Sequence, residues 1–252
     1  MRPRTAILLA AAAVYIVAYY VPFGDLALYP LTLFTTWVHE MGHGLTALAL
    51  GGRFDSLEIF KNAGGVAHSW AGGGWPHALV ALGGLLAPPI VGACILATVH
   101  GPRRARMALA ALAAALVASM IIWVRSATGL VAMPMVAVAL AYAAVREPPE
   151  RRVIIAQVLA VVLAIDTLTR MVGYVFEDTV DIAGKKVPSD IATVADGFGG
   201  PQLVWGCAVT AVAVGLLAVA LWWAWRRPVS ARASSSSAPR AAPRAPSRIP
   251  SR

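Results

Sequence analysis

Residues 27–50 read ALYPLTLFTTWVHEMGHGLTALAL, an apolar stretch with two histidines and a glutamate near its centre. The stretch is long enough to cross the roughly 30 Å hydrocarbon core of a bilayer as one helix. On such a helix His39 and His43, four residues apart, lie on one face, one turn from each other. Ionisable side chains are costly inside a bilayer and are generally kept there for a partner or a function. The stretch therefore predicts a membrane helix with a polar site on one face.

Similar apolar runs recur along the whole chain. Of its 252 residues, 59% are hydrophobic and only 13% are charged, unlike an ordinary soluble domain. Runs near the roughly 20 residues that a spanning helix needs occupy 5–23, 27–50, 78–99, 106–124, 127–145, 153–176 and 203–225. We therefore expect an all-α polytopic membrane protein of about six to seven transmembrane helices, located in the cell membrane as a multi-pass integral protein.

The net charge of +9 does not indicate a nucleic-acid partner. The basic residues lie mainly in short loops and in the tail, where the positive-inside rule of membrane topology accounts for them. We expect residues 1–227 to form one membrane domain with the lipid bilayer as its partner. Residues 228–252 contain mostly Ser, Ala, Pro and Arg, with almost nothing to bury, and are expected to form a disordered basic tail.

A β-hairpin is expected directly after the histidine-bearing helix, at about residues 53–70. Residues 53–60 alternate in the manner of a strand, residues 66–70 supply a partner, and Lys61-Asn62-Ala63-Gly64-Gly65 between them provides turn residues. A second polar interval, 177–202, is rich in aspartate and glycine. The pattern there does not specify an element.

The segment His39-Glu40-Met41-Gly42-His43 has the H-E-x-x-H spacing of metallopeptidases. Two imidazoles one turn apart can bind one Zn²⁺, which lowers the pKa of a water ligand. The intervening carboxylate, Glu40, is then placed to act as general base when that water attacks a peptide carbonyl. The alternative is a structural His/Glu cluster that bonds to neighbouring helices.

A peptidase zinc needs a third protein ligand, and three aspartates are candidates. Asp190 precedes the last apolar run and is suited either to be the ligand or to cap a helix. Asp166 lies four residues before Arg170, so the two can form an ion pair on one helix face. Asp196, followed by Gly197, resembles a turn. The sequence leaves the choice open.

Small and interfacial residues also carry information about packing. Gly83, Gly84 and Gly92 would let another helix approach the run at 78–99 closely, and the helix that bears His39 is the expected neighbour. His68, His77 and His100 lie near predicted membrane boundaries, and we interpret them as interfacial residues.

Four stretches together resemble the site-2 protease family of intramembrane zinc metallopeptidases, specifically its short B-like branch, which lacks a PDZ domain. They are His39-Glu40-Met41-Gly42-His43-Gly44; Gly51-Gly52-Arg53 with Leu57-Glu58; Gly64-Gly65-Val66; and Ser189-Asp190 followed by Gly199-Gly200 and Trp205-Gly206. The better known members carry a late Leu-Asp-Gly segment that supplies the third ligand. Here only Ala195-Asp196-Gly197 is similar, in different surroundings.

This resemblance implies a zinc metalloendopeptidase with His39 and His43 as metal ligands and Glu40 as catalytic base. It implies a transmembrane protein as substrate, cleaved in or near the bilayer, and a hairpin edge that receives an unwound substrate strand. Two other functions remain open: a non-proteolytic metal-binding membrane protein, and a transporter that uses Asp166, Arg170 and the histidines as a relay.

Overall fold

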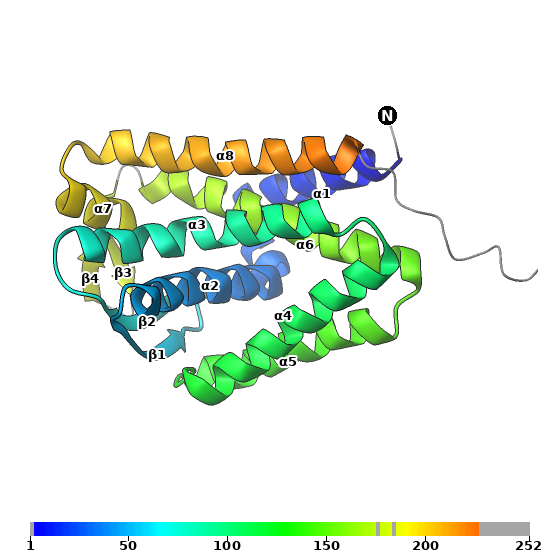
Figure 1. Cartoon of the computed structure of the whole chain (residues 1–252), viewed down its shortest axis with the longest axis horizontal. Coiled ribbons are helices and arrows are strands. Elements are labelled where there is room, and N and C mark those ends of the chain that lie inside the picture. Colours follow the sequence, from blue (N-terminus) through cyan, green and yellow to red (C-terminus); the bar gives the residue numbers. More distant parts are fainter. Residues whose placement is uncertain (1–2, 175–176, 183–184, 227–252) are drawn as a thin grey trace, which may run out of the picture.

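The computed structural model describes residues 3–174, 177–182 and 185–226. In chain order the elements are α1 (Pro3–Tyr20), α2 (Gly24–Ala49), β1 (Arg53–Ile59), β2 (Gly65–Trp70), α3 (Trp75–Thr98), α4 (Pro102–Ile122), α5 (Ala127–Val145), α6 (Pro149–Tyr174), β3 (Thr179–Ile182), β4 (Lys185–Pro188), α7 (Asp190–Phe198) and α8 (Gln202–Arg226). The two short hairpins and α7 lie together at one end of the helix bundle (Figure 1). The tail expected at 228–252 lies outside the described residues.

Most of the long helices are suited to cross a membrane. Among the described residues, five helices, α3 to α6 and α8, are long and apolar enough to do so. Helices α1 and α2 meet this condition only as a pair, which is bent by 118° and makes a sixth span if counted as one. The runs 5–23 and 27–50, predicted as two spans, are thus joined at a sharp bend, where Phe23 has a left-handed φ of 63°. The predicted all-α polytopic fold is confirmed.

Helix α3 lies at the centre of the bundle, where it contacts α2, α6, α7 and α8. Small residues bring α2 and α3 close together, because a Cβ at Gly42 would collide with the main chain at Gly83, and one at Gly84 with the His43 ring. The prediction that Gly83 and Gly84 accommodate the motif helix is confirmed, whereas Gly92 faces α6. This contact fixes the histidine-bearing turn of α2 against α3.

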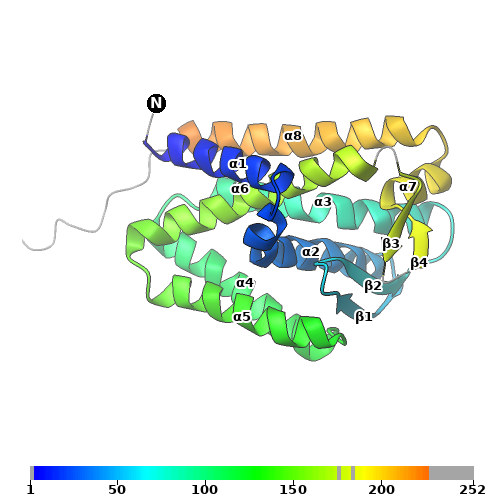
Figure 2. The same ribbon diagram turned by 180° about the vertical axis from the view of Figure 1, so that it is seen from behind.

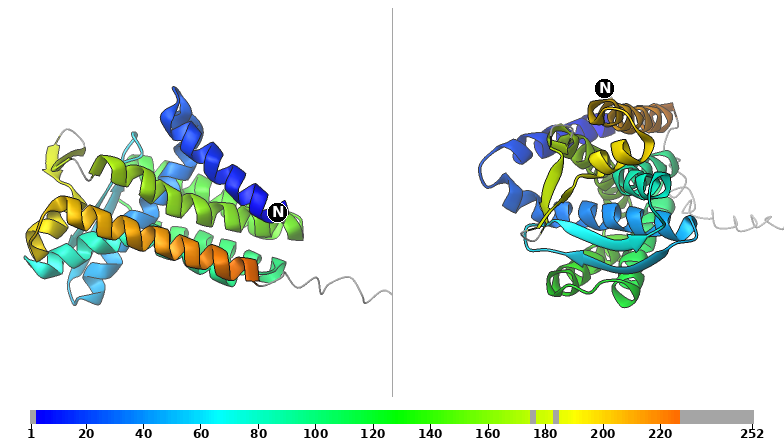
Figure 3. Two further views of the ribbon diagram at one scale, coloured as in Figure 1. Left: turned by 90° about the horizontal axis from the view of Figure 1, so that it is seen from above. Right: turned by 90° about the vertical axis from the view of Figure 1, so that its left-hand side faces the viewer.

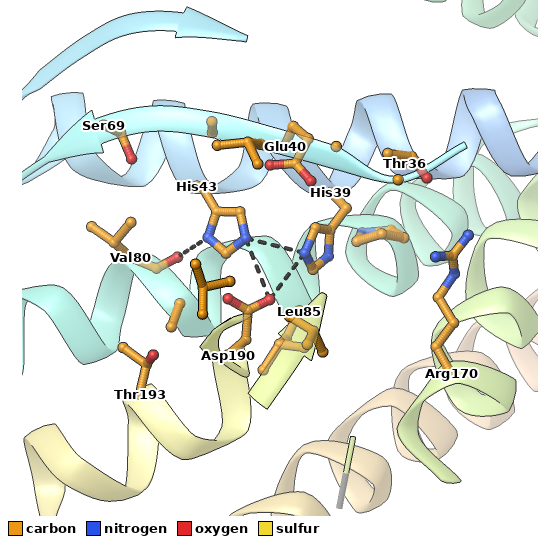
Figure 4. A pocket seen from close by; sticks show the side chains of 18 of the residues that line it. Thr36, His39, Glu40, His43, Ser69, Val80, Leu85, Arg170, Asp190 and Thr193 are labelled. Carbon is orange, nitrogen blue, oxygen red and sulfur yellow. Dashed lines mark hydrogen bonds and ion pairs between the residues drawn. The ribbon is translucent and has the colours of Figure 1, made fainter. Parts of the chain in front are cut away.

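The predicted hairpin is present, with β1 and β2 antiparallel from the pair Arg53–Trp70 to the pair Ile59–Gly65. The outer edge of β1 is occupied by the link between α4 and α5. Leu57 donates its N–H to the Trp123 carbonyl at 2.8 Å, and Leu57 O accepts from the Arg125 N–H at 3.0 Å. The opposite edge, on β2, runs alongside α2 (Figure 4).

A second hairpin, β3–β4, lies between α6 and α7, within the interval where the sequence did not specify an element. Its register pairs Val180 with Val187, so both valines lie on one face. Ser189 closes the base by donating its N–H to the Asp178 carbonyl at 3.0 Å. In the end-on view of Figure 3 this hairpin (yellow) stands close to the β1–β2 hairpin (cyan).

Candidate metal centre

The imidazoles of His39 and His43 lie side by side on α2, as their helical spacing predicts. Their Nε2 atoms are 3.1 Å apart, and the ring planes are nearly perpendicular, at 88°. Both rings are partly buried and point away from the body of α2 (Figure 4). Two nitrogen donors therefore converge on one point outside the helix.

A carboxylate from α7 completes the group. Asp190 Oδ2 lies 3.0 Å from His39 Nε2 and 3.4 Å from His43 Nε2. Donors on a tetrahedral zinc, each about 2.0–2.1 Å from the ion, are separated by about 3.3 Å. The three observed separations lie close to this value, and two imidazoles with one carboxylate are a donor set that zinc accepts. The residues present thus fit a zinc ion with three protein ligands.

The proton on His43 is fixed by a main-chain acceptor on α3. Its Nδ1 lies 2.9 Å from the carbonyl oxygen of Val80, which can only accept, so Nδ1–H is the donor. In the neutral ring Nε2 then carries the lone pair, and it faces Asp190 and His39. Such an outer contact is the usual way in which a metal-binding histidine is oriented.

Asp190 is presented by the first turn of α7. The helix is capped by Ser189, whose Oγ accepts the Ala192 N–H at 3.2 Å, so the alternative that Asp190 itself is the cap is wrong. Its carboxylate is thereby left to face the histidines. Partial burial raises the pKa of the Asp190 carboxyl, but the two imidazoles outweigh burial and hold its pKa well below its ordinary range. The group is therefore ionised at neutral pH, the state in which a carboxylate can bind a metal ion.

The other two candidate aspartates lie elsewhere. Asp166 is buried within α6, where the predicted ion pair with Arg170 is present, with 2.9 Å between Oδ2 and Nε. Its other oxygen, Oδ1, accepts the Tyr15 hydroxyl at 2.6 Å. Asp196 is exposed, farther along α7. Of the three, Asp190 alone joins both histidines in one group of metal-binding atoms within the described chain.

Glu40 lies beneath strand β2, beside His39 (Figure 4). It is 5% exposed, and β2 passes so close that a Cβ at Gly65 would lie 2.6 Å from Glu40 Cγ and 2.7 Å from Oε1. The turn of the hairpin is attached to the same helix, since Thr36 Oγ1 donates to the Ala63 carbonyl at 2.7 Å. The strand and the carboxylate therefore hold each other in position.

These groups share one cavity of about 690 Å³. It is lined by the two histidines, Glu40 and Asp190, by consecutive residues of β2 and its turn from Gly64 to Ser69, and by parts of α3, α6 and β4. All six of these hairpin residues line it, so the main-chain edge of β2 borders the site. This cavity, which joins the edge of β2, the buried Glu40 carboxylate and the three candidate metal ligands, has room for an extended peptide.

Several cavity residues were not assigned to the site from sequence. His68 and His77 were interpreted as interfacial, yet both line the cavity, and His68 Nε2 lies 3.6 Å from Glu58 Oε1. Their positions follow from strand pairing and from the start of α3 rather than from a motif. The alternation at 53–60 was the one local signal that could have placed them. It puts Ser56 and Glu58 on the same side of β1, and His68 pairs with Ser56 from β2.

The site brings together a histidine pair, a buried glutamate and an aspartate that is distant in the sequence. They meet in a cavity among helices suited to span a membrane, and this combination is typical of membrane-embedded metallopeptidases. Comparison with known proteins supports this assignment, because the family model Peptidase M50B-like matches residues 6–220. The chain belongs to this M50B-like peptidase family. No curated protein and no solved structure matches it.

Proposed function

We propose that this protein is an intramembrane zinc endopeptidase that hydrolyses peptide bonds of a membrane-embedded protein substrate. In this proposal His39, His43 and Asp190 are the zinc ligands and Glu40 is the general base. The observation that carries the proposal is the convergence of three metal-binding atoms, 3.0–3.4 Å apart, within the cavity that holds Glu40.

The catalytic residues divide the chemistry between them. When bound, zinc lowers the pKa of a water ligand and polarises the substrate carbonyl. Glu40 takes the proton of the attacking water and transfers it to the leaving amine. His43 stays correctly oriented because Nδ1 donates to the Val80 carbonyl. The burial of Glu40 below β2 keeps its carboxylate from rotating into other positions.

The edge of β2 supports an extended substrate rather than a helical one. A peptide bond inside a helix is shielded by its own hydrogen bonds, so it must be unwound before hydrolysis. A strand that adds to an open sheet edge gains main-chain hydrogen bonds in return. The edge of β1 is occupied by residues 123–125, whereas the edge of β2 borders the cavity. The substrate is therefore proposed to bind along β2, above Glu40.

The test compares purified wild-type protein with the Glu40→Gln variant. Both are expected to bind one zinc per chain by elemental analysis, since Glu40 is not a ligand in this proposal. Only the wild type is expected to cleave single-span peptides in detergent micelles, with products identified by mass spectrometry. Wild-type protein that is folded but retains no zinc would contradict the proposal.

The two alternative functions predict different results. A non-proteolytic metal-binding protein would retain zinc and cleave no peptide in either form. A transporter would move protons or metal ions across liposomes even after loss of His39. The structure gives little support to a relay through Asp166, because Tyr15 and Arg170 already bond both of its oxygens.

A further inference from the structure

Arginines gather at the end of the helix bundle that lies opposite the two hairpins. Figure 2 shows the start of α1, the α3–α4 and α5–α6 links and the end of α8 together at this end. Arg4 lies in the first turn of α1, and Arg226 is the last residue of α8. The two links and the adjoining helix turns carry Arg103, Arg104, Arg106, Arg146, Arg151 and Arg152. We call this end of the described bundle the basic end.

The opposite end, which we call the hairpin end, has fewer basic residues and more acidic ones. It comprises β1–β2, the α4–α5 link, β3–β4 and α7. Within the described chain its basic residues are Arg53, Lys61, Arg125, Lys185 and Lys186. Its acidic residues there, apart from the candidate ligand Asp190, are Asp55, Glu58, Glu177, Asp178, Asp181 and Asp196. The two ends of the membrane domain therefore differ in charge.

The number of spans places the start of α1 and the end of α8 on the same side of the membrane. Counted as one span, the bent pair α1–α2 makes six crossings together with α3, α4, α5, α6 and α8. Because six is an even number, the chain returns to the side on which α1 begins. The α4–α5 link lies on the other side, where residues 123–125 bond to Leu57 of β1. All segments of the basic end thus face one compartment, and both hairpins face the other.

Exposed tryptophans lie at both ends of the bundle. At the basic end Trp222 is 49% exposed, and the Arg226 guanidinium lies 4.0 Å from the centre of its ring. At the hairpin end Trp70 and Trp75 are 59% and 58% exposed. Tryptophan is enriched where a membrane protein crosses the lipid–water interface. Each end of the bundle is therefore expected to lie at one surface of the membrane.

The metal centre lies nearer to the hairpin end. Val80, which accepts the hydrogen bond of His43 Nδ1, is five residues after Trp75 and eighteen before Thr98, the last residue of α3. At about 1.5 Å per residue these intervals correspond to about 7.5 Å and about 27 Å along the helix axis. The cavity is also lined by His68 of β2, whose side chain is 51% exposed. The candidate ligands therefore lie in the half of the bilayer that adjoins the hairpins, and their cavity reaches the surface there.

The distribution of charge decides which compartment each end faces. Lys and Arg in short loops are found in excess on the cytoplasmic side of membrane proteins, whereas Asp and Glu contribute little to orientation. Anionic lipids of the cytoplasmic leaflet also attract basic segments that adjoin a span. The start of α1, the α3–α4 and α5–α6 links and the end of α8 all meet these conditions, because each of them carries arginine.

We infer that the basic end faces the cytoplasm and that the metal centre opens to the extracytoplasmic side, within the outer half of the bilayer. Water, zinc and the scissile segment of a membrane-embedded substrate then reach the cavity from outside the cytoplasm. The orientation of the helices does not depend on the chemistry of the site. The side on which a substrate is cut rests on the proposed function.

The first experiment measures the accessibility of single cysteines in the full chain. Cys94 and Cys207 are replaced by alanine, and one cysteine is introduced at an exposed position that carries no positive charge. Asn62→Cys and Asp178→Cys report on the hairpin end, and Glu150→Cys is the matched position at the basic end. Spheroplasts of a bacterial host that expresses each variant are treated with a maleimide that does not cross membranes, before and after they are opened.

The orientation predicts opposite labelling at the two ends. Asn62→Cys and Asp178→Cys are expected to be labelled as fully in intact spheroplasts as in opened ones. Glu150→Cys is expected to be labelled only after opening. Labelling of Glu150→Cys in intact spheroplasts, or of the two hairpin-end cysteines only in opened ones, would overturn the inference.

The second experiment tests the side from which the metal is reached. Wild-type protein and a single-span reporter substrate are expressed together, and cleavage is followed in spheroplasts with and without EDTA, which does not cross membranes. EDTA is expected to stop cleavage in intact spheroplasts as completely as in opened ones. Cleavage that resists EDTA until the spheroplasts are opened would overturn the inference. Failure of the proposed function would look different, because no reporter would then be cleaved even without EDTA, whereas the labelling pattern of the cysteines would be unchanged.

Discussion

Replacing Gly65 by alanine would push strand β2 away from Glu40, the proposed general base, without touching a proposed metal ligand. Gly65 is the first residue of β2, and its Cα faces Glu40 and Thr36. A methyl group there would lie 2.6 Å from Glu40 Cγ, 2.7 Å from Glu40 Oε1 and 2.8 Å from Thr36 Cγ2. The chain therefore has no room for alanine unless β2 or Glu40 moves.

The required movement sets the size of the effect. Carbon atoms in contact prefer about 3.5–4.0 Å, so the two carbon–carbon contacts, with Glu40 Cγ and Thr36 Cγ2, are too short by roughly 1 Å. Overpacking of this kind costs about 1–3 kcal/mol of stability. A misplacement of about 1 Å in a catalytic arrangement lowers the rate about a hundredfold. We expect Gly65→Ala to reduce kcat/KM by about two orders of magnitude and to lower the melting temperature modestly.

The assay is cleavage of single-span peptides, with zinc content measured on the same samples. Zinc stoichiometry is expected to stay at one per chain, because the strand moves while the ligands on α2 and α7 do not. Gly64→Ala is the matched control: its added Cβ would meet Asn62 Oδ1 at 3.1 Å, and that exposed side chain can turn away. Full activity in Gly65→Ala, or loss of its zinc, would refute the close packing of β2 on Glu40.

Three further substitutions test the metal centre. Asp190→Asn is expected to weaken zinc binding about tenfold or more in a competition titration, whereas Asp196→Asn, on an exposed position of the same helix, should bind zinc as the wild type does. Gly84→Ala places a methyl group against the His43 ring, so zinc affinity should fall even if the protein remains folded. Ser189→Ala removes the cap of α7, so it should cost about 1 kcal/mol of stability and weaken zinc binding. Ser189→Asp, which can also cap a helix, should restore both the stability and the zinc affinity. An unchanged zinc affinity in Ser189→Ala would show that the cap does not position Asp190.

The parts of the fold that could be predicted from sequence are those specified by local pattern. The spacing of His39 and His43 needs only helical periodicity, and the first hairpin needs only alternation on both sides of a turn that contains Gly64. The bend between α1 and α2 was not predicted, because the apolar runs on both sides have spanning length. The chain turns in the short break between Tyr20 and Gly24, where Phe23 has a left-handed φ of 63°.

The second hairpin could not be predicted because its sequence carries little local signal for strands. Four-residue strands carry too few positions to show alternation, and Val180 and Val187 are the only pair that shares an apolar face toward the cavity within the described part of β3 and β4. The neighbouring residues Asp178 and Lys186 are exposed and resemble a loop. The pairing of β3 with β4 depends instead on tertiary contacts. Ser189 joins the two ends of the hairpin through its hydrogen bond to the Asp178 carbonyl, and the hairpin packs beside the cavity.

The choice of Asp190 as the candidate third ligand depends on where the residue lies in the fold and not only on its being an aspartate. Three aspartates had suitable chemistry, and only tertiary packing separates them. Helix α7 is held against the bundle by Ile191 and Val194, which are fully buried in a cluster with residues of α3, α6 and α8. No sequence pattern around residue 190 reports which helices that apolar face will meet.

The two halves of the site are therefore held by different means. The histidines and Glu40 belong to one helix, so their mutual geometry is fixed by its hydrogen bonds. Asp190 depends on Ser189, which caps α7 and also accepts a hydrogen bond from Gln202 at the start of α8. Zinc affinity should consequently respond to changes in α7 and α8 that leave α2 intact, whereas the orientation of Glu40 should not. A metal bound between two such parts joins them, so its removal should loosen α7 and the β3–β4 hairpin before it disturbs the motif helix.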